Sequence, residues 1–339
     1  MYCSIFSRHG FSKLTFAALA WGLSAAAIAQ VTENIDATIQ SDLAGDLALA
    51  SLVHDKDTLS LGFKSFDPNR YLPIDDDNIG SAESIQLQSE LTTITLPYTW
   101  ELSNEGLGFT PYLNGRLGLL ERRNNVALFD DTNIPKDRRR ISIYSGYFGG
   151  GGIWQVSDSW SIDASLGAFY QRYENVYRYG SDASEAFKPI IDGYIANFDL
   201  NVWQLNPAIS AQYDFTWNDN LLQYRSRLSY NRGRSFDTDL DAHDFTINSA
   251  SWRNSLFYFH PFGDVLGLPS TGIVGLSRID LKGDVSRSLD TGAFYELHLD
   301  YRVDIKPYGF DLFDNLTFGL LINYGSSLKG ASLTFSFND

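Results

Sequence analysis

A histidine with two acidic neighbours stands in an alternating stretch near the end of this 339-residue chain. His298 lies between Glu296 and Asp300, and because alternate residues of a strand share a face, the three side chains would be neighbours. An imidazole between two carboxylates could bind a metal ion or transfer protons. Such groups also pair with one another in polar interiors, and we prefer that structural interpretation. We therefore predict no catalytic, metal-binding or cofactor-binding residue.

Arginine side chains form a second group that could do chemistry. Arg116, Arg225 and Arg227 occupy polar positions of alternating segments, and residues 138–140 are three consecutive arginines. A row of guanidinium groups could guide anionic solutes through a pore. A network of salt bridges with carboxylates would use the same residues, and we favour the network. The residues predicted to line the interior are Glu90, Arg116, Asp163, Arg225, Arg227, Glu296, His298, Asp300 and Arg302.

The elements that would carry these residues are strands with one apolar and one polar face. Residues 331–337 alternate between apolar or small residues and hydroxyl residues without exception, and residues 315–325 do so with Leu321 as the one apolar intruder. Alternation, β-branched and aromatic content and turn residues predict about twelve strands. They span residues 59–66, 85–97, 107–121, 140–156, 159–173, 195–214, 221–236, 243–260, 271–281, 292–304, 315–325 and 331–337.

The N-terminus indicates export. Basic residues such as Arg8 precede an apolar run over residues 14–27, and a small-residue exit ends at Ala29. We predict a cleaved signal peptide over residues 1–29, which also removes Cys3, the only cysteine. No other segment has the roughly 18 consecutive apolar residues that a membrane-spanning helix needs. The net charge of −15 argues against a nucleic-acid partner, because phosphates require a basic surface.

The segment that follows the signal has a helical period. Ile35, Ile39, Leu43 and Leu47 recur every four residues, surrounded by Asp36, Asp42 and Asp46. This spacing predicts a helix over residues 30–58 with one apolar stripe, and Thr32 could cap it. The helix could lie against the base of the domain, or it could plug a pore. As a plug it would limit permeability, and its aspartates could meet luminal Arg116, Arg225 and Arg227.

Strands with a polar inner face in an exported chain predict a closed antiparallel transmembrane β-barrel over residues 59–339. Closure satisfies every backbone edge in lipid, which an open sheet cannot do. Long polar connections at one end and tight turns near Asp158 and Asn218 at the other follow the outer-membrane pattern, with both mature termini expected on the periplasmic side. Segments 85–97 and 195–214 change phase midway, which predicts a bulge or a misplaced boundary.

Short motifs then connect the chain to a known family. They are the leader helix running directly into the first strand, Asp67-Pro68-Asn69-Arg70-Tyr71-Leu72-Pro73, Gly80-Ser81, Leu96-Pro97-Tyr98 and the aromatic-rich end. On these residues the chain resembles the solitary outer-membrane autotransporter-like β-barrels. The resemblance implies a translocator-type barrel without a secreted passenger, in the outer membrane of a Gram-negative bacterium. Asn338 and Asp339 depart from the pattern, because many such barrels end on an aromatic residue.

Three functions remain open at this stage. The preferred one is a structural or translocator-like barrel, and the second is a diffusion channel for small, anionic solutes. The third and weakest is a barrel-embedded hydrolase, for which the sequence offers no convincing arrangement of serine and histidine. The expected partners are outer-membrane lipid, lipopolysaccharide and the outer-membrane insertion machinery.

Overall fold

The structure is a computed structural model that describes residues 25–55, 61–66, 91–103, 106–126, 135–265, 267–306, 315–325 and 330–337. Its helices are α2 (Ala25–Val53), α4 (Asp182–Glu185), α5 (Lys188–Ile191), α6 (Asp284–Ser288) and the 3-10 helix η2 (Asp241–His243). Its strands are β1 (Leu61–Phe66), β2 (Leu91–Glu101), β3 (Thr110–Val126), β4 (Asp137–Gln155), β5 (Trp160–Arg178), β6 (Phe198–Trp217), β7 (Asn220–Phe236), β8 (Thr246–Val265), β9 (Leu268–Gly283), β10 (Ala293–Asp304), β11 (Asn315–Gly325) and β12 (Gly330–Phe337).

Several predictions made from the sequence lie outside the described residues. These are the N-terminal part of the signal peptide, Glu90, the motifs at residues 67–73 and 80–81, and the two residues after Phe337. Among the described residues, no helix is both long and apolar enough to cross a membrane.

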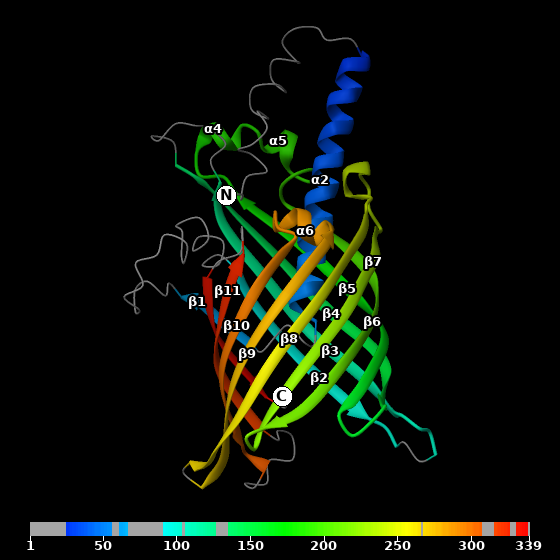
Figure 1. The fold of residues 1–339 in the computed structure, drawn as a ribbon. Coiled ribbons are helices and arrows are strands. Elements are labelled where there is room, and N and C mark those ends of the chain that lie inside the picture. Colours follow the sequence, from blue (N-terminus) through cyan, green and yellow to red (C-terminus); the bar gives the residue numbers. More distant parts are fainter. Residues whose placement is uncertain are drawn as a thin grey trace.

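All twelve strands belong to one antiparallel sheet in the order β1-β12-β11-β10-β9-β8-β7-β6-β5-β4-β3-β2. The first strand pairs with the last, with Leu61 opposite Phe335 and Phe66 opposite Ala331. β1 and β2 stand at the two ends of this order, and their Cα atoms approach within 8 Å. The sheet therefore curves into the barrel seen in Figure 1. The predicted twelve-stranded antiparallel β-barrel with an N-terminal helix is confirmed.

The barrel wall has an apolar outside and a mostly polar inside. On β10, Tyr295 is 42% exposed and its neighbour Glu296 is 3% exposed, as the alternation of a strand requires. On β11, Phe318 points outward while Thr317 and Leu321 are buried inside. Large apolar side chains on the outside of a barrel are the groups that contact lipid.

The two ends of the barrel differ in their connections. The segments 135–136, 179–197, 237–245 and 284–292 lie at one end, called here the long-loop end, and carry α4, α5, η2 and α6. At the other end, the turn between β6 and β7 contains only Asn218 and Asp219, both with positive φ, as a tight hairpin turn requires. Exposed tryptophans Trp154, Trp160 and Trp217 lie near this short-turn end, where an interfacial aromatic belt is expected.

Helix α2 enters the barrel from the long-loop end and descends into its interior (Figure 1). Gln40 bonds to the β7–β8 connection near this end, whereas Asp55 reaches Arg116 farther down the wall. The prediction that both mature termini lie at the short-turn end is therefore wrong for the N-terminal side, because α2 begins beyond the long loops. Helix α2 also runs continuously through Thr32, so Thr32 is not its cap.

A single apolar stripe does not describe α2. Ile39, Leu43 and Leu47 are buried, and Ile35 packs against the same core, but Ala44 and Ala50 on other faces are buried as well. From about Leu43 downward the wall surrounds the helix completely, and a helix enclosed on all sides is expected to be apolar all round.

The predicted phase change in β6 is also wrong. β6 keeps one register with β5, and its even-numbered residues face inward from Leu200 to Ser210. Leu200 and Val202 pack in the core around α2, whereas Asn206 and Ser210 line the polar interior below it. The lining changes character because α2 fills only part of the lumen. For residues 85–97, only those from Leu91 onward are described.

Candidate functional site: the helix-filled lumen

The upper part of α2 is held by the long connections. The Tyr194 hydroxyl of the β5–β6 connection donates to Asp36, and Gln40 Nε2 donates to the carbonyl oxygen of Asp241 at 2.7 Å. Burial and the bond to Asp36 raise the pKa of Tyr194 above its ordinary value, so the hydroxyl remains a donor. Gly45 packs against α6 so closely that an added Cβ would lie 2.8 Å from Ser288 Cβ.

Two buried glutamines form a polar collar around the middle of α2. Gln171 of β5 and Gln204 of β6 both direct Nε2 toward the carbonyl oxygen of Leu47, at 3.4 and 3.3 Å. Gln204 also donates to Gln171, which lies 3.3 Å from the Ser51 hydroxyl. Because buried amides need partners, these bonds specify the depth of the helix.

Charged groups hold the lower part of α2. Asp46 forms a 2.9 Å ion pair with Arg122 of β3. At the end of the helix, Asp55 lies 4.0 Å from Arg116 and 3.4 Å from Arg227, and Arg116 donates to the carbonyl oxygen of His54 at 2.8 Å. The wall thus places two arginines against one aspartate at the C-terminal end of α2, where the helix dipole also favours cations.

This pairing corrects the expected one. Asp36 accepts a hydrogen bond from Tyr194, and Asp46 pairs with Arg122, which was not among the arginines predicted to meet these aspartates. Asp42 is half-buried on the same helix, near neither Arg116 nor Arg227 in the recorded ion pairs of the described residues. The reason is helix length: a 1.5 Å rise per residue carries only residues after Ser51 down to those arginines.

Arg116 is fixed by aromatic rings as well as by Asp55. Its guanidinium carbon lies 3.6 Å from the ring centre of Tyr147, within the range of a cation–π contact. The Tyr147 ring lies over glycines, since a Cβ on Gly149 would come 2.7 Å from its hydroxyl. A Cβ on Gly151 would likewise meet the ring of Tyr112, so the run of glycines at residues 149–152 makes space for tyrosines. Space for the helix comes from Gly118, where a Cβ would approach the His54 ring to 2.6 Å.

A second charged cluster contains the histidine singled out in the sequence. Glu296 forms a buried ion pair with Arg253, and His298 Nε2 lies 3.4 Å from Glu296. Asp300 is placed over Gly319, whose added Cβ would collide with the carboxylate. In the part of the chain that the structure describes, no three His, Cys, Asp or Glu side chains are arranged to hold a metal ion. No described serine is hydrogen-bonded to His298.

The match to a family model decides the identity of this barrel. Residues 44–339 match the model of the solitary outer membrane autotransporter β-barrel domain. The chain belongs to this family. The match begins within the buried half of α2, so the lower part of the plug is covered together with all twelve strands. Membership places this autotransporter-type barrel in the outer membrane of a Gram-negative bacterium. The general pattern of short periplasmic turns and longer outer loops predicts that its long-loop end faces outward.

Two solved structures resemble this autotransporter-type barrel in fold. The β domain of the Bordetella autotransporter BrkA has a TM-score of 0.40 at 13% identity, covering 73% of this chain and 87% of that one. LpxR from Salmonella typhimurium has a TM-score of 0.41 at 8% identity, covering 75% of this chain and 90% of that one. No curated protein matches the sequence.

The remaining luminal residues of the autotransporter-type barrel lie on separate parts of its wall. Arg225 donates to Gln212 at 2.8 Å, and Asp163 accepts from Tyr112 at 2.7 Å. Arg302 lies over the ring of Phe259. Arg302 thus packs on an aromatic ring of β8, whereas Arg116 and Arg227 meet at Asp55.

Sequence reasoning missed the residues that hold α2 most directly. These are Asp55, Arg122, Gln171 and Gln204. The helical spacing of Leu47, Ser51 and Asp55 could have extended the buried face to Asp55. No local pattern could have paired it with Arg116 and Arg227.

Proposed function

We propose that this protein is a translocator-type outer-membrane barrel kept closed by its own α2 helix. The observation that carries the proposal is the enclosure of α2: Leu47 is 0% exposed, and Asp55 lies between Arg116 and Arg227. A solute would have to displace this helix to pass through the upper lumen. The barrel therefore works as a scaffold around a threaded segment and has low permeability at rest.

The direction of the chain supports the translocator-type assignment. α2 begins outside the long-loop end and runs into the barrel. β1 then starts in the half of the wall nearer the short-turn end, where Leu61 pairs with Phe335 of β12. The covalent chain thus passes through the lumen from the outer end toward the inner end. That is the path of a segment that has reached the outside through its own barrel.

Single-channel conductance in a planar bilayer tests the closure. The mature chain should give small or no openings, and deletion of residues 31–56 should raise conductance while heat-modifiable gel migration still reports a folded barrel. Thr38→Ala is the matched control, because Thr38 is exposed on the same helix and should leave conductance unchanged. If the deletion variant is folded and its conductance equals that of the mature chain, the lumen is not closed by α2.

Arg116 and Arg227 support a second candidate, a diffusion channel for small anions. Two guanidinium groups face one carboxylate at this level, so displacement of Asp55 leaves a cationic constriction. The deletion variant should therefore prefer chloride over potassium in reversal-potential measurements. A channel function also requires openings in the mature chain, whereas the closed-barrel function requires their absence.

A further inference from the structure

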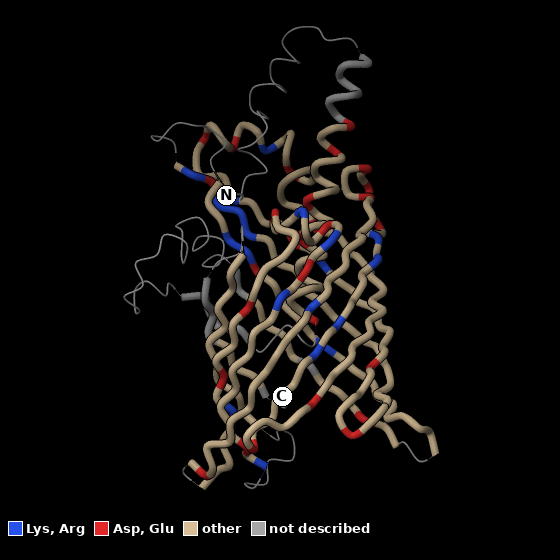
Figure 2. Tube along the Cα trace, in the orientation of Figure 1, with Lys and Arg blue, Asp and Glu red and all other residues tan. Residues whose placement is uncertain are grey.

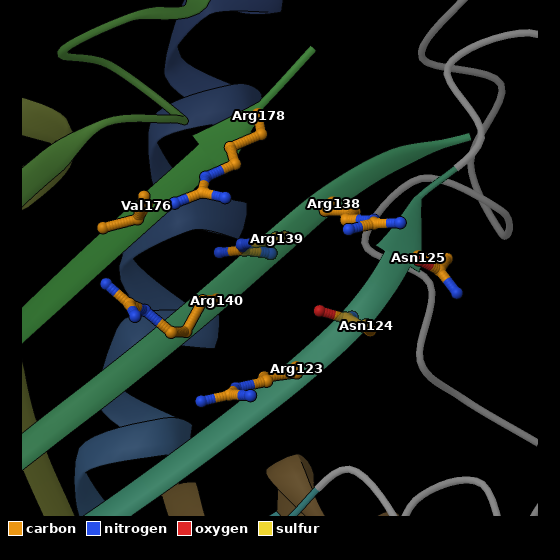
Figure 3. Close-up of a pocket in the computed structure, with 8 residues that line it drawn as sticks. All are labelled: Arg123, Asn124, Asn125, Arg138, Arg139, Arg140, Val176 and Arg178. Atoms are coloured by element: carbon orange, nitrogen blue, oxygen red, sulfur yellow. The ribbon is translucent and has the colours of Figure 1, made fainter. Parts of the chain in front are cut away.

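Four arginines form a patch on the outside of the barrel, on the opposite side of the wall from luminal groups such as Arg122 and Arg139. They are Arg123 of β3, Arg138 and Arg140 of β4, and Arg178 of β5, here named the outer arginine cluster. With Asn124, Asn125, Arg139 and Val176 they line a cavity of about 390 Å³. Figure 3 shows these side chains on three adjacent strands, with α2 behind the strands.

The alternation of β4 and β5 places the cluster on the lipid side of the wall. Odd-numbered residues of β4, such as Ile141 and Ile143, are buried in the core around α2. Even-numbered residues point outward, and Phe148 is 62% exposed. Arg138 and Arg140 share the parity of Phe148, so their side chains leave the barrel on its outer face.

The strand register brings like charges directly opposite one another. Arg123 is the Cα partner of Arg140, and Arg138 is the partner of Arg178. Like charges at directly opposite positions destabilise a sheet, and here two such pairs are adjacent. This arrangement is unfavourable unless an anion neutralises it.

Within the described residues, the protein neutralises little of this charge. Arg123 forms a 2.6 Å ion pair with Glu121, but no described carboxylate forms an ion pair with Arg138, Arg140 or Arg178. Nearby Arg172, on the same outer face of β5, is paired with both Glu174 and Asp199. Because Arg172 has carboxylate partners and these three arginines have none among the described residues, we infer that an external anion neutralises the cluster.

The position of the cluster along the barrel axis indicates which kind of anion could bind there. Arg138 is the second residue of β4 and Arg178 the last of β5, so both lie at the long-loop end. Figure 2 shows basic residues gathered near the upper ends of these strands. The exposed ring of Tyr144 lies four residues below Arg140, about 13 Å along the strand, and belongs to the apolar outside. The cluster thus lies just above the apolar wall, where phosphorylated headgroups of outer-leaflet lipid are located.

We propose that the outer arginine cluster binds the phosphate groups of an outer-leaflet glycolipid of the lipopolysaccharide type. Guanidinium forks match phosphate oxygens in bidentate geometry, and a doubly phosphorylated sugar would place negative charge against both like-charged pairs. Its acyl chains would lie along the apolar outside below, beside Tyr144 and Phe148. The lipid would then contact the wall beside β3, β4 and β5.

Binding of fluorescent lipid A to the folded, full mature chain in detergent micelles tests this site. The combined variant Arg138→Gln, Arg140→Gln and Arg178→Gln should lose about tenfold or more in affinity, as expected for removal of three cations facing an anionic headgroup. Dephosphorylated lipid A should bind the parent as weakly as phosphorylated lipid A binds the variant. A higher salt concentration should lower the affinity of the parent for lipid A until it approaches that of the triple variant.

Arg172→Gln is the matched control, because Arg172 points outward from the same strand but is already neutralised. It should bind lipid A within about twofold of the parent, by analogy with other exposed ion pairs that contribute little. Heat-modifiable migration must show that every variant is folded. Equal affinity of parent and triple variant, or equal affinity for dephosphorylated lipid A, would overturn the proposal. Displacement of the lipid by inorganic phosphate at equal concentration would assign the site to free phosphate and overturn the lipid assignment.

Discussion

The upper and lower halves of this lumen have different linings on the same strands. On β6, Leu200 and Val202 are buried in an apolar core around α2, and farther down Asn206 and Ser210 face a polar interior. The outer face of the strand does not change, since Trp203 and Ile209 are both exposed toward lipid. The comparison teaches that lipid dictates the outer half of the strand pattern, whereas the inner half follows whatever fills the barrel at each level.

The polar collar and the ion pairs mark the boundary between these halves. Gln171 and Gln204 surround α2 at Leu47, and below them Asp55 meets Arg116 and Arg227. Above this level apolar packing holds the helix together with the Asp46–Arg122 ion pair, and below it the contacts of Asp55 are charged. A polar substitution in the upper, apolar half should therefore lower the free energy of unfolding more than a polar substitution in the lower half.

The largest effect is expected from Asp55→Asn. It removes the carboxylate between two buried guanidinium groups, and an uncompensated buried charge costs about 3–5 kcal/mol. We expect this loss of unfolding free energy in denaturant titration of the barrel, together with more frequent openings in a planar bilayer. A loss below about 1 kcal/mol would show that water screens the lower lumen as it does a surface pair.

The next largest loss of unfolding free energy is expected from a charged substitution on the lipid-facing side of the wall. Leu320→Arg puts a cation on the lipid face of β11 and should cost about 2–4 kcal/mol if it lies near the bilayer midplane. Asn323→Arg, on the inner face of the same strand, should be milder because the lumen is polar there. Denaturant titration in lipid vesicles measures both, and equal losses would contradict the assignment of the two faces.

A matched pair on β6 tests the split lumen directly. Val202→Asn buries an amide in the apolar core and should cost about 1–3 kcal/mol. Ser210→Asn exchanges one polar group for another in the lower half and should cost less than about 1 kcal/mol. Both residues face inward on the same strand, so equal losses in denaturant titration would mean that the interior is uniform.

The orientation of α2 can be tested without altering stability. Cysteines introduced one at a time for exposed Glu33, Asp182 and Asn218 should report the two ends of the barrel. An impermeant maleimide added to intact cells should label Glu33→Cys and Asp182→Cys and spare Asn218→Cys. Labelling of Asn218→Cys alone would show that the barrel has the opposite orientation in the membrane.

Much of the barrel could be predicted because its strands repeat one local rule. Tyr295, Leu299 and Phe318 alternate with polar neighbours, and each segment shows this without reference to any other. The expected segments 315–325 and 292–304 agree closely with β11 and β10. Strand ends were less accurate, as at β5, which continues to Arg178 because paired backbone extends beyond the alternating core of the segment.

The helix was predicted over residues 30–58, whereas α2 spans Ala25–Val53, and the groups that surround it were predicted wrongly. Its four-residue spacing identified Ile39, Leu43 and Leu47, but a stripe implies one buried side, and the wall encloses α2 on all sides. The same limit produced the false phase change in β6: an apolar Val202 was taken for an outward residue because the expected interior was polar throughout.

By itself, the sequence determined which side of regularly alternating strands such as β10 and β11 faces lipid, because a period of two is a local property and lipid is present along the whole outer wall. Only the tertiary structure decided what the inner side contacts. Asp55 meets Arg116 and Arg227 because α2 enters from the long-loop end and ends at their level. The depth and direction of that insertion depend on the whole barrel wall, and they cannot be predicted from the residue spacing within a single segment.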